Sequence, residues 1–279
     1  MRDNGESKMR DNMSERNKKA DSKADSKYDS VAILGAMDEE VENIAAGLEN
    51  VTKVKVAGME ITEGYFCADS GLADGDCADG DCSDTGSANS GKLRKIRVAA
   101  AVSGMGTVNA ACAAQCLIDK YSPDAVILSG IAGNLNKNLR INDIVLGKTM
   151  KYLDSDMRLI AQSAPFSEEF HADTHLLSLA EKVLDSRGIN YVSGIIATGD
   201  RFIDDKEEAA KIREETGADA VEMEGAAICH AAARNGIPSL VIRVMSDNAD
   251  VQYEVFKEFD ISEFAHSAAD IVLDILHNI

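Results

Sequence analysis

An alternation of short β-branched runs with amphipathic stretches of helical period constrains the fold of this chain most strongly. Because parallel strands need a helical crossover, this order predicts an α/β fold with a mixed, largely parallel central sheet. Runs typical of buried strands lie at residues 31–36, 96–104, 125–133, 143–152, 191–200 and 239–247. Helical stretches lie at residues 38–48, 107–121, 175–188, 204–217, 224–236 and 262–277. A glycine, which readily adopts the left-handed conformation that ends many helices, closes three of them at Gly188, Gly217 and Gly236.

Two segments depart from this alternation. Residues 1–28 contain MRDN twice and ADSK twice with almost no large apolar residue, so we expect a disordered polar tail. Residues 67–91 carry six aspartates and no basic residue, which favours a flexible acidic loop between two strands. Their Asp-Gly-Asp-Cys repeats lack the ligand spacing of a calcium-binding loop. Residues 29–279 are long enough to form a single domain around this insertion.

Charge and composition exclude several classes of protein. The chain has 29 Lys and Arg against 48 Asp and Glu, and this net charge of −19 opposes nucleic-acid binding. No stretch approaches the ~20 apolar residues of a membrane helix, so we expect a cytoplasmic protein without a membrane partner. Six scattered cysteines lack the paired spacing of a zinc site, and we expect reduced thiols at Cys67, Cys77, Cys82, Cys112, Cys116 and Cys229.

Glycine, methionine and carboxylate residues are concentrated where the predicted strands end. Ligands of open α/β sheets bind beyond the carboxyl ends of the strands, and the residues there read GAMDEE (35–40), SGMG (103–106), GIAG (130–133), TGDRFI (198–203), EMEG (222–225) and RVMSD (243–247). Glycines let the backbone approach a ligand, and methionines line adaptable apolar pockets. Such a lining would suit a flat heterocycle joined to a polar sugar.

Each of these residues also has a purely structural interpretation. Glu40 and Glu224 could complement a helix dipole, and Asp247 could cap the next segment. Arg243, inside an apolar strand, could be an ion-pair partner. The concentration of three carboxylates and one arginine at strand ends favours a functional site.

Five segments together carry a family resemblance. VAILGAMDEEV, VSGMGTVNAA, ATGDRFI, AVEMEGAA and VIRVMSDNAD resemble, in order and spacing, segments of the 5′-methylthioadenosine/S-adenosylhomocysteine nucleosidases of the nucleoside phosphorylase superfamily. The resemblance covers residues 31 to 279 apart from the acidic loop. It implies a three-layer α/β/α sandwich and a homodimer in which the partner subunit helps to complete each site. It also implies hydrolysis of the bond between adenine and ribose in a small purine nucleoside, without metal or cofactor.

The resemblance assigns catalytic roles to four residues. Glu40 is similar to the family's carboxylate that deprotonates the attacking water, and Asp247 to the acid at purine N7. Glu224 would bind the ribose hydroxyls, and Arg243 would support the network of water and carboxylates. Cleavage builds positive charge on the sugar and negative charge on the leaving base, so an acid at the base and anions at the ribose fit this chemistry. To serve as an acid near neutral pH, Asp247 needs a raised pKa.

The same resemblance assigns substrate contacts. Phe202 would stack on adenine, the backbone of Ile203 would read its Watson–Crick edge, and Ser246 would hold Asp247. The full set of implied contacts is Met37, Met105, Gly106, Ala132, Gly133, Phe202, Ile203, Glu222, Met223 and Ser246.

Two departures from the family pattern leave alternatives open. Ile131 stands where family members often carry a small hydroxyl residue. The segment after Asp250 is longer than the family pattern, so the aromatic residue that closes over the sugar could be Tyr253, Phe256 or Phe259. There are three competing hypotheses. The protein could be a phosphorylase, an enzyme that acts on another purine nucleoside such as futalosine or on AMP, or an inactive nucleoside-binding protein. Three carboxylates in the loop that begins at Gly35 would repel phosphate, which favours the hydrolase.

Overall fold

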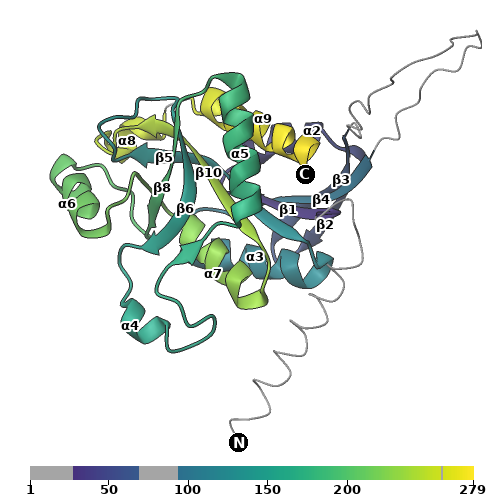
Figure 1. The fold of residues 1–279 in the computed structure, drawn as a ribbon, viewed down its shortest axis with the longest axis horizontal. Helices are drawn as coiled ribbons and strands as arrows, with labels where there is room; N and C mark the ends of the chain where they lie inside the picture. Colours follow the sequence, from purple (N-terminus) through teal and green to yellow (C-terminus); the bar gives the residue numbers. More distant parts are fainter. Residues whose placement is uncertain (1–27, 69–93, 259) are drawn as a thin grey trace, which may run out of the picture.

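The computed structural model describes residues 28–68, 94–258 and 260–279 (Figure 1). The rest of the predicted tail and most of the predicted acidic loop lie outside the described residues. The prediction of a tail is wrong for Tyr28, which is buried and donates its hydroxyl hydrogen to Asp173 Oδ1 at 2.8 Å. Cys67 and Ala68, which we placed in the acidic loop, belong to a strand.

The strands of the described residues form one mixed sheet. Their bounds are β1 Ser30–Gly35, β2 Glu49–Val56, β3 Met59–Ala68, β4 Arg94–Val102, β5 Ala125–Asn134, β6 Ile144–Tyr152, β7 Phe170–His171, β8 Tyr191–Thr198, β9 Ala220–Glu222 and β10 Ser239–Asp247. Strands β4, β1, β5 and β10 are neighbours in that order and run parallel. Strand β10 also pairs antiparallel with β6, and pairings through β8 and β9 lead back to β5, so these five strands close into a ring. The α/β class is therefore confirmed.

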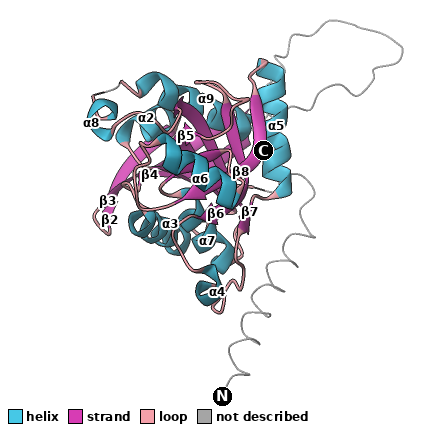
Figure 2. Ribbon diagram, turned by 90° about the vertical axis from the view of Figure 1, so that its left-hand side faces the viewer, coloured by secondary structure: helices cyan, strands magenta, loops and turns pink. Residues whose placement is uncertain are grey.

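Helices cover both faces of the sheet (Figures 1 and 2). Their bounds are α2 Asp38–Ala46, α3 Thr107–Tyr121, α4 Met157–Ile160, α5 Thr174–Arg187, α6 Lys206–Thr216, α7 Gly225–Asn235, α8 Tyr253–Phe256 and α9 Ser262–Asn278. Residues of α2, α5 and α9 join one hydrophobic cluster, and residues of α3 and α7 join another. The sheet thus lies between two helical layers. Within the described residues, no helix is long and apolar enough to cross a membrane.

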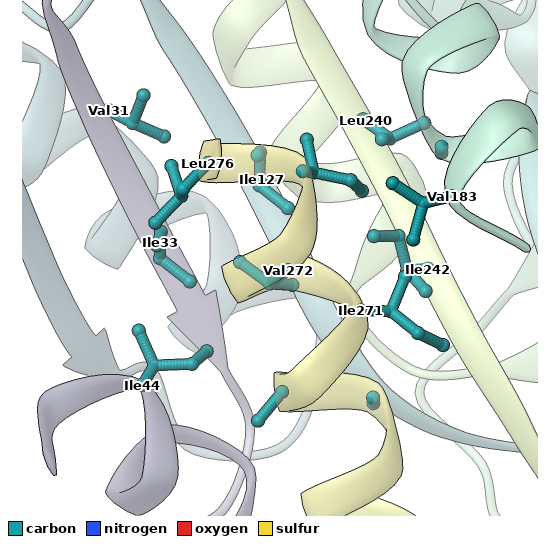
Figure 3. Close-up of a cluster of buried hydrophobic side chains, with 14 of the residues drawn as sticks. Val31, Ile33, Ile44, Ile127, Val183, Leu240, Ile242, Ile271, Val272 and Leu276 are labelled. Atoms are coloured by element: carbon teal, nitrogen blue, oxygen red, sulfur yellow. The ribbon is translucent and has the colours of Figure 1, made fainter. Parts of the chain in front are cut away.

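Strand β1 shows how the sequence produces these two layers. Successive side chains of a strand point to opposite faces, and all six residues of β1 are buried. Val31 and Ile33 pack into the cluster with Val272 of α9 (Figure 3), whereas Ala32 and Leu34 pack into the cluster with α3. A continuous apolar run is therefore required, because neither face of this strand meets water.

The ends of the elements follow local chemistry. Asp173 and Asp205 accept hydrogen bonds from the first backbone N–H groups of α5 and α6, as helix N-caps do. Gly188, Gly217 and Gly236 end α5, α6 and α7 with φ values of 65°, 72° and 66°, which confirms the three predicted helix ends. Strand β10 has a register shift against β5 between Met245 and Asp247, at the carboxyl end where the predicted site residues lie.

Candidate active site

A single pocket contains nearly all of the predicted site residues. It lies at the carboxyl ends of β1, β5, β8, β9 and β10, where ligands of α/β sheets bind. Its lining consists of Ala36, Met37, Glu40, Met105, Ile131, Ala132, Gly133, Arg201, Phe202, Ile203, Val221, Glu222, Met223, Glu224, Arg243, Ser246, Asp247, Tyr253 and Phe256. Of the predicted residues only Gly106 is not in this lining.

Glu40 is buried at the start of α2, with 1% of its surface exposed. Its Oε2 accepts hydrogen bonds from the backbone N–H of Ala36 at 2.6 Å and of Met37 at 3.2 Å, and its Oε1 accepts one from Ile131 N at 3.0 Å. Burial raises the pKa of the Glu40 carboxyl, against the opposing effects of Arg243 and these three donors. A raised pKa suits a group that must accept a proton near neutral pH.

Arg243 joins three buried carboxylates from separate elements. Its Nη2 contacts the carboxylate of Glu222 and lies 3.0 Å from Glu224 Oε2, and its Nη1 lies 3.9 Å from Glu40 Oε1. Its guanidinium is 1% exposed. An isolated buried charge is very costly, so the position of Arg243 in an apolar strand depends on these partners. One arginine therefore serves three carboxyl groups beside the pocket.

Glu224 precedes α7 and faces the loop before α3. Its Oε1 accepts a hydrogen bond from Gly106 N at 2.9 Å. Burial, with a smaller contribution from Glu222, raises the pKa of Glu224 to about 7, although Arg243 and Gly106 oppose this shift. Gly106 therefore acts on the site through its backbone N–H group, although it is not part of the pocket lining.

Glu222 holds Arg243 and the start of α7 in place. Its carboxylate accepts hydrogen bonds from the hydroxyl of Thr198 and from the backbone N–H groups of Glu224 and Gly225. With Arg243 as a further partner, both oxygens are engaged within the protein. Glu222 lines the pocket as predicted, but its two carboxylate oxygens accept hydrogen bonds from neighbouring residues of the protein.

Asp247 is the last residue of β10 and lines the same pocket as Glu40. Its Oδ2 accepts from Ser246 Oγ at 2.8 Å and its Oδ1 from Ala249 N at 2.6 Å. Burial raises the pKa of the Asp247 carboxyl, although both hydrogen bonds oppose the shift. The environment thus favours a protonated carboxyl, which is what a general acid requires.

Aromatic side chains form an apolar wall of the pocket. The ring of Phe202 lies 5.3 Å from that of Tyr253 and 5.0 Å from that of Phe256, measured between centroids. Both α8 aromatics therefore reach the pocket, while Phe259 lies outside the described residues. Ile203, also in the lining, is 5% exposed.

Sequence reasoning missed residues that shape the site without touching a ligand. A Cβ on Gly130 would clash with the Glu40 carboxylate and the Arg243 guanidinium, so their ion pair requires glycine at this position. Thr198 holds Glu222, and Arg201 lines the pocket while it pairs with Glu208. The GIAG segment pointed to Gly130, but nothing in the sequence indicated which side chains would pass over it. Among the described residues, no cluster of three or more His, Cys, Asp or Glu could hold a metal ion.

The sequence and the fold match a known class of enzymes. The sequence model of the phosphorylase superfamily matches residues 81–277. A 5′-methylthioadenosine/S-adenosylhomocysteine nucleosidase of Shewanella sediminis is 33% identical over 249 residues, which cover 87% of this chain and 96% of that protein. One of Bacillus pumilus is 31% identical with the same coverage.

Solved structures give the same result. The chain resembles the nucleosidase of Neisseria meningitidis in complex with methylthio-immucillin-A, with a TM-score of 0.75, 30% identity, and coverage of 90% of this chain and 100% of that one. It also resembles a futalosine hydrolase of Helicobacter pylori, with a TM-score of 0.72, 26% identity, and coverage of 90% and 98%. The chain belongs to the family of 5′-methylthioadenosine/S-adenosylhomocysteine nucleosidases.

Proposed function

We propose that this protein hydrolyses the N-glycosidic bond of 5′-methylthioadenosine, S-adenosylhomocysteine or both, releasing adenine and a thioribose product. The observation that carries the proposal is the placement of two kinds of carboxyl group along one pocket. Asp247, whose burial favours the protonated form, lines the same pocket as the aromatic residues. Glu40 and Glu224, which also line this pocket, are joined through Arg243.

The arrangement suggests a definite course for the reaction. Adenine lies against Phe202 with its N7 toward Asp247, and the ribose hydroxyls face Glu224. As the bond between C1′ and N9 breaks, its electron pair passes to the purine ring, and N7 takes the proton of Asp247. Water then adds to C1′ and gives its proton to Glu40. The negative charge around Arg243 stabilises the positive charge that develops on the sugar.

Hydrolysis is favoured over phosphorolysis by the charges of the pocket. The guanidinium of Arg243 is already engaged by Glu40, Glu222 and Glu224. Phosphate approaching C1′ would meet these carboxylates in a site of low dielectric, where repulsion is strong. A neutral water molecule meets no such barrier.

Ile131 does not argue against catalysis. Its backbone N–H is one of the three donors that hold Glu40, and any residue type except proline provides that donor. Its side chain, 7% exposed, contributes an apolar surface to the pocket. The network around Glu40 therefore forms without the hydroxyl that family members often carry, which supports an active enzyme over a binding protein.

The decisive experiment is a chromatographic assay of adenine release from 5′-methylthioadenosine in metal-chelated buffer, with and without phosphate. We expect phosphate-independent release together with free methylthioribose. Release that requires phosphate would make the protein a phosphorylase. Futalosine is assayed in parallel, because one structural neighbour is a futalosine hydrolase, and binding without turnover of either compound would support the binding-protein hypothesis.

We also propose that the enzyme is a cytoplasmic homodimer that does not bind nucleic acid. Several large apolar side chains are solvent-exposed in the monomer, among them Met105, Val108, Leu159 and Phe166. Because Met105 also lines the pocket, a second copy that covered this residue would help to enclose the substrate. Light scattering coupled to gel filtration should give twice the monomer mass of 29.8 kDa, and a fully active monomer would contradict this proposal.

A further inference from the structure

Asp200 joins two loops that are far apart in the sequence. It lies in the segment after β8, and its Oδ1 accepts a hydrogen bond from Thr107 N at 2.6 Å. Its Oδ2 accepts one from Thr107 Oγ1 at 2.5 Å. Thr107 is the first residue of α3, so a single carboxylate ties this segment to the start of that helix. We name this pair of residues the Asp200–Thr107 clamp.

Each end of the clamp is next to a different wall of the pocket. On one side, Phe202 and Ile203 lie two and three residues after Asp200 and form part of the apolar wall. On the other side, Gly106 precedes Thr107 and donates its N–H to Glu224 Oε1 at 2.9 Å. Asp200 itself is exposed and is not part of the pocket lining. Its carboxylate therefore connects the two walls from outside.

The surrounding backbone leaves little freedom at this junction. Gly106 has a φ of +96°, and a Cβ on it would lie 3.1 Å from Asp200 Oδ1. A Cβ on Gly199 would lie 2.6 Å from Leu153 Cγ and 3.0 Å from Asp154 Oδ2. That same Asp154 oxygen accepts a hydrogen bond from Asp200 N at 3.1 Å. Glycine is therefore required at positions 106 and 199. The hydrogen bond from Asp200 N to Asp154 also holds the segment after β8, and it does not involve the Asp200 side chain.

We propose that Asp200 is a positioning residue that fixes the distance between the adenine wall and the ribose wall of the pocket. The inference rests on the proposed function, because it takes Phe202 to face the base and Glu224 to face the sugar. A nucleoside touches both walls, so its binding depends on their separation. Free adenine touches only the wall that contains Phe202, and that wall keeps its tie to Asp154 when the clamp is broken.

The test compares a ligand that spans both walls with one that does not. Variants Asp200→Ala, Asp200→Asn and Thr107→Val are assayed for KM and kcat with 5′-methylthioadenosine and for inhibition by adenine. Thr107→Val keeps the backbone N–H and loses only the hydroxyl, and Asp200→Asn keeps one acceptor oxygen. Asp119→Asn is the matched control, because Asp119 is an exposed aspartate of α3 whose carboxylate accepts from Gln115, on the same helix.

We expect Asp200→Ala to raise KM on the order of tenfold, the usual effect of losing hydrogen bonds to a charged group, while the adenine inhibition constant changes by less than about threefold. Asp200→Asn and Thr107→Val should show smaller increases in KM. Asp119→Asn should change neither constant. The difference between nucleoside and adenine is the signature of a positioning role.

A purely structural role of Asp200 as the cap of α3 would have a different outcome. It would lower Tm and weaken the binding of nucleoside and adenine equally, and that result would overturn the proposal. An unchanged KM in well-folded Asp200→Ala would also overturn it. If Asp200→Ala did not fold, the same comparison in Asp200→Asn and Thr107→Val would decide. A wild-type protein that released no adenine would instead reject the proposed function.

Discussion

At the scale of single residues, the protonation state of Asp247 can be changed without altering its shape. In Asp247→Asn the amide oxygen can still accept from Ala249 N, which lies 2.6 Å from Oδ1 in the wild type, but the side chain no longer carries an acidic proton. We expect adenine release at saturating substrate to fall by a factor on the order of 10²–10⁴, the span of general acid catalysis. Ser246→Ala, which keeps the carboxyl, should lose less. Near-normal turnover of Asp247→Asn would remove Asp247 from the mechanism.

Glu224 predicts a pH dependence of stability. Burial raises its pKa from an ordinary 4.5 to about 7 in the folded protein, where Arg243, Glu222 and Glu40 surround it. Between these two values the folded state binds more protons than the unfolded state, so the contribution of Glu224 to stability falls as the pH rises. A glutamine at this position has nearly the shape of the protonated Glu224 side chain and stays uncharged at every pH. Glu224→Gln should therefore gain stability relative to wild type between pH 5 and pH 8, by about 3 kcal/mol.

Thermal unfolding of both proteins at several pH values measures this difference directly. Titrating groups distant from Glu224 contribute equally to both proteins and cancel in the comparison. A difference in Tm between variant and wild type that stays constant from pH 5 to pH 8 would show that the pKa of Glu224 is not raised.

The types of side chain in the sequence predicted most of the candidate site, but the sequence did not predict its backbone hydrogen-bond donors. Carboxylates and Arg243 at strand ends are unusual enough to be found by inspection. The donors from Ile131 and Gly106 are backbone N–H groups, which nearly every residue has, so only the folded chain shows where they point. The sequence also could not show that Glu222 bonds to Thr198 and Arg243, because those contacts join three separate elements.

At the scale of elements, the sequence analysis missed β2 and β3, whose buried residues are interrupted by exposed ones, and the very short β7 and β9. Strand β2 is mostly exposed, so it has no continuous apolar run, and its hairpin with β3 turns at Ala57 and Gly58, both with positive φ. Ala-Gly is a weaker turn signal than Asn-Gly. Strand β9 has three residues, too few to show a period. The six predicted strands were found because they are buried between helices.

The neighbouring positions of β5 and β10 give an element-scale prediction. Arg243 of β10 is paired with Gly130 of β5, and a methyl group on Gly130 would enter the space that Glu40 and Arg243 share. We expect Gly130→Ala to lower the free energy of unfolding by about 1–3 kcal/mol and turnover on the order of 100-fold, because the catalytic carboxylate is displaced.

Gly236→Ala is the matched control for this substitution. Gly236 has a φ of +66° and no atom within 4 Å of an added Cβ, so alanine there costs about 1 kcal/mol of backbone strain and no contact. The control should lose stability while folded enzyme keeps full turnover. If Gly130→Ala behaved in the same way, the close packing over Gly130 would have no catalytic importance.

At the scale of the whole molecule, residues from three distant parts of the chain meet around Arg94. Its guanidinium donates to the backbone oxygen of Tyr28 at 2.6 Å and to that of Ile279, the last residue. Tyr28 is buried and bonds to Asp173 beside α5. The junction lies far along the sheet from the pocket lining, so its substitution should alter stability and leave the chemistry intact.

Tyr28→Ala should therefore lower Tm by roughly 6–12 °C, because a large buried aromatic is lost. Tyr28→Phe loses only the hydroxyl contact with the Asp173 carboxylate, worth about 1.5 kcal/mol, and should shift Tm less. Turnover of either variant at low temperature should equal that of wild type. A selective loss of activity in Tyr28→Ala would show that this junction communicates with the pocket.

The position of β10 also has a consequence for biosynthesis. This strand is the last in chain order, yet it lies between β5 and β6 and carries Arg243, Ser246 and Asp247. Until the ribosome has released it, the facing edges of β5 and β6 have no partner there and can pair with other chains. A nascent or prematurely terminated chain therefore holds Glu40 and Glu224 without the arginine that neutralises them. The catalytic site is therefore complete only after this late strand has been inserted between β5 and β6.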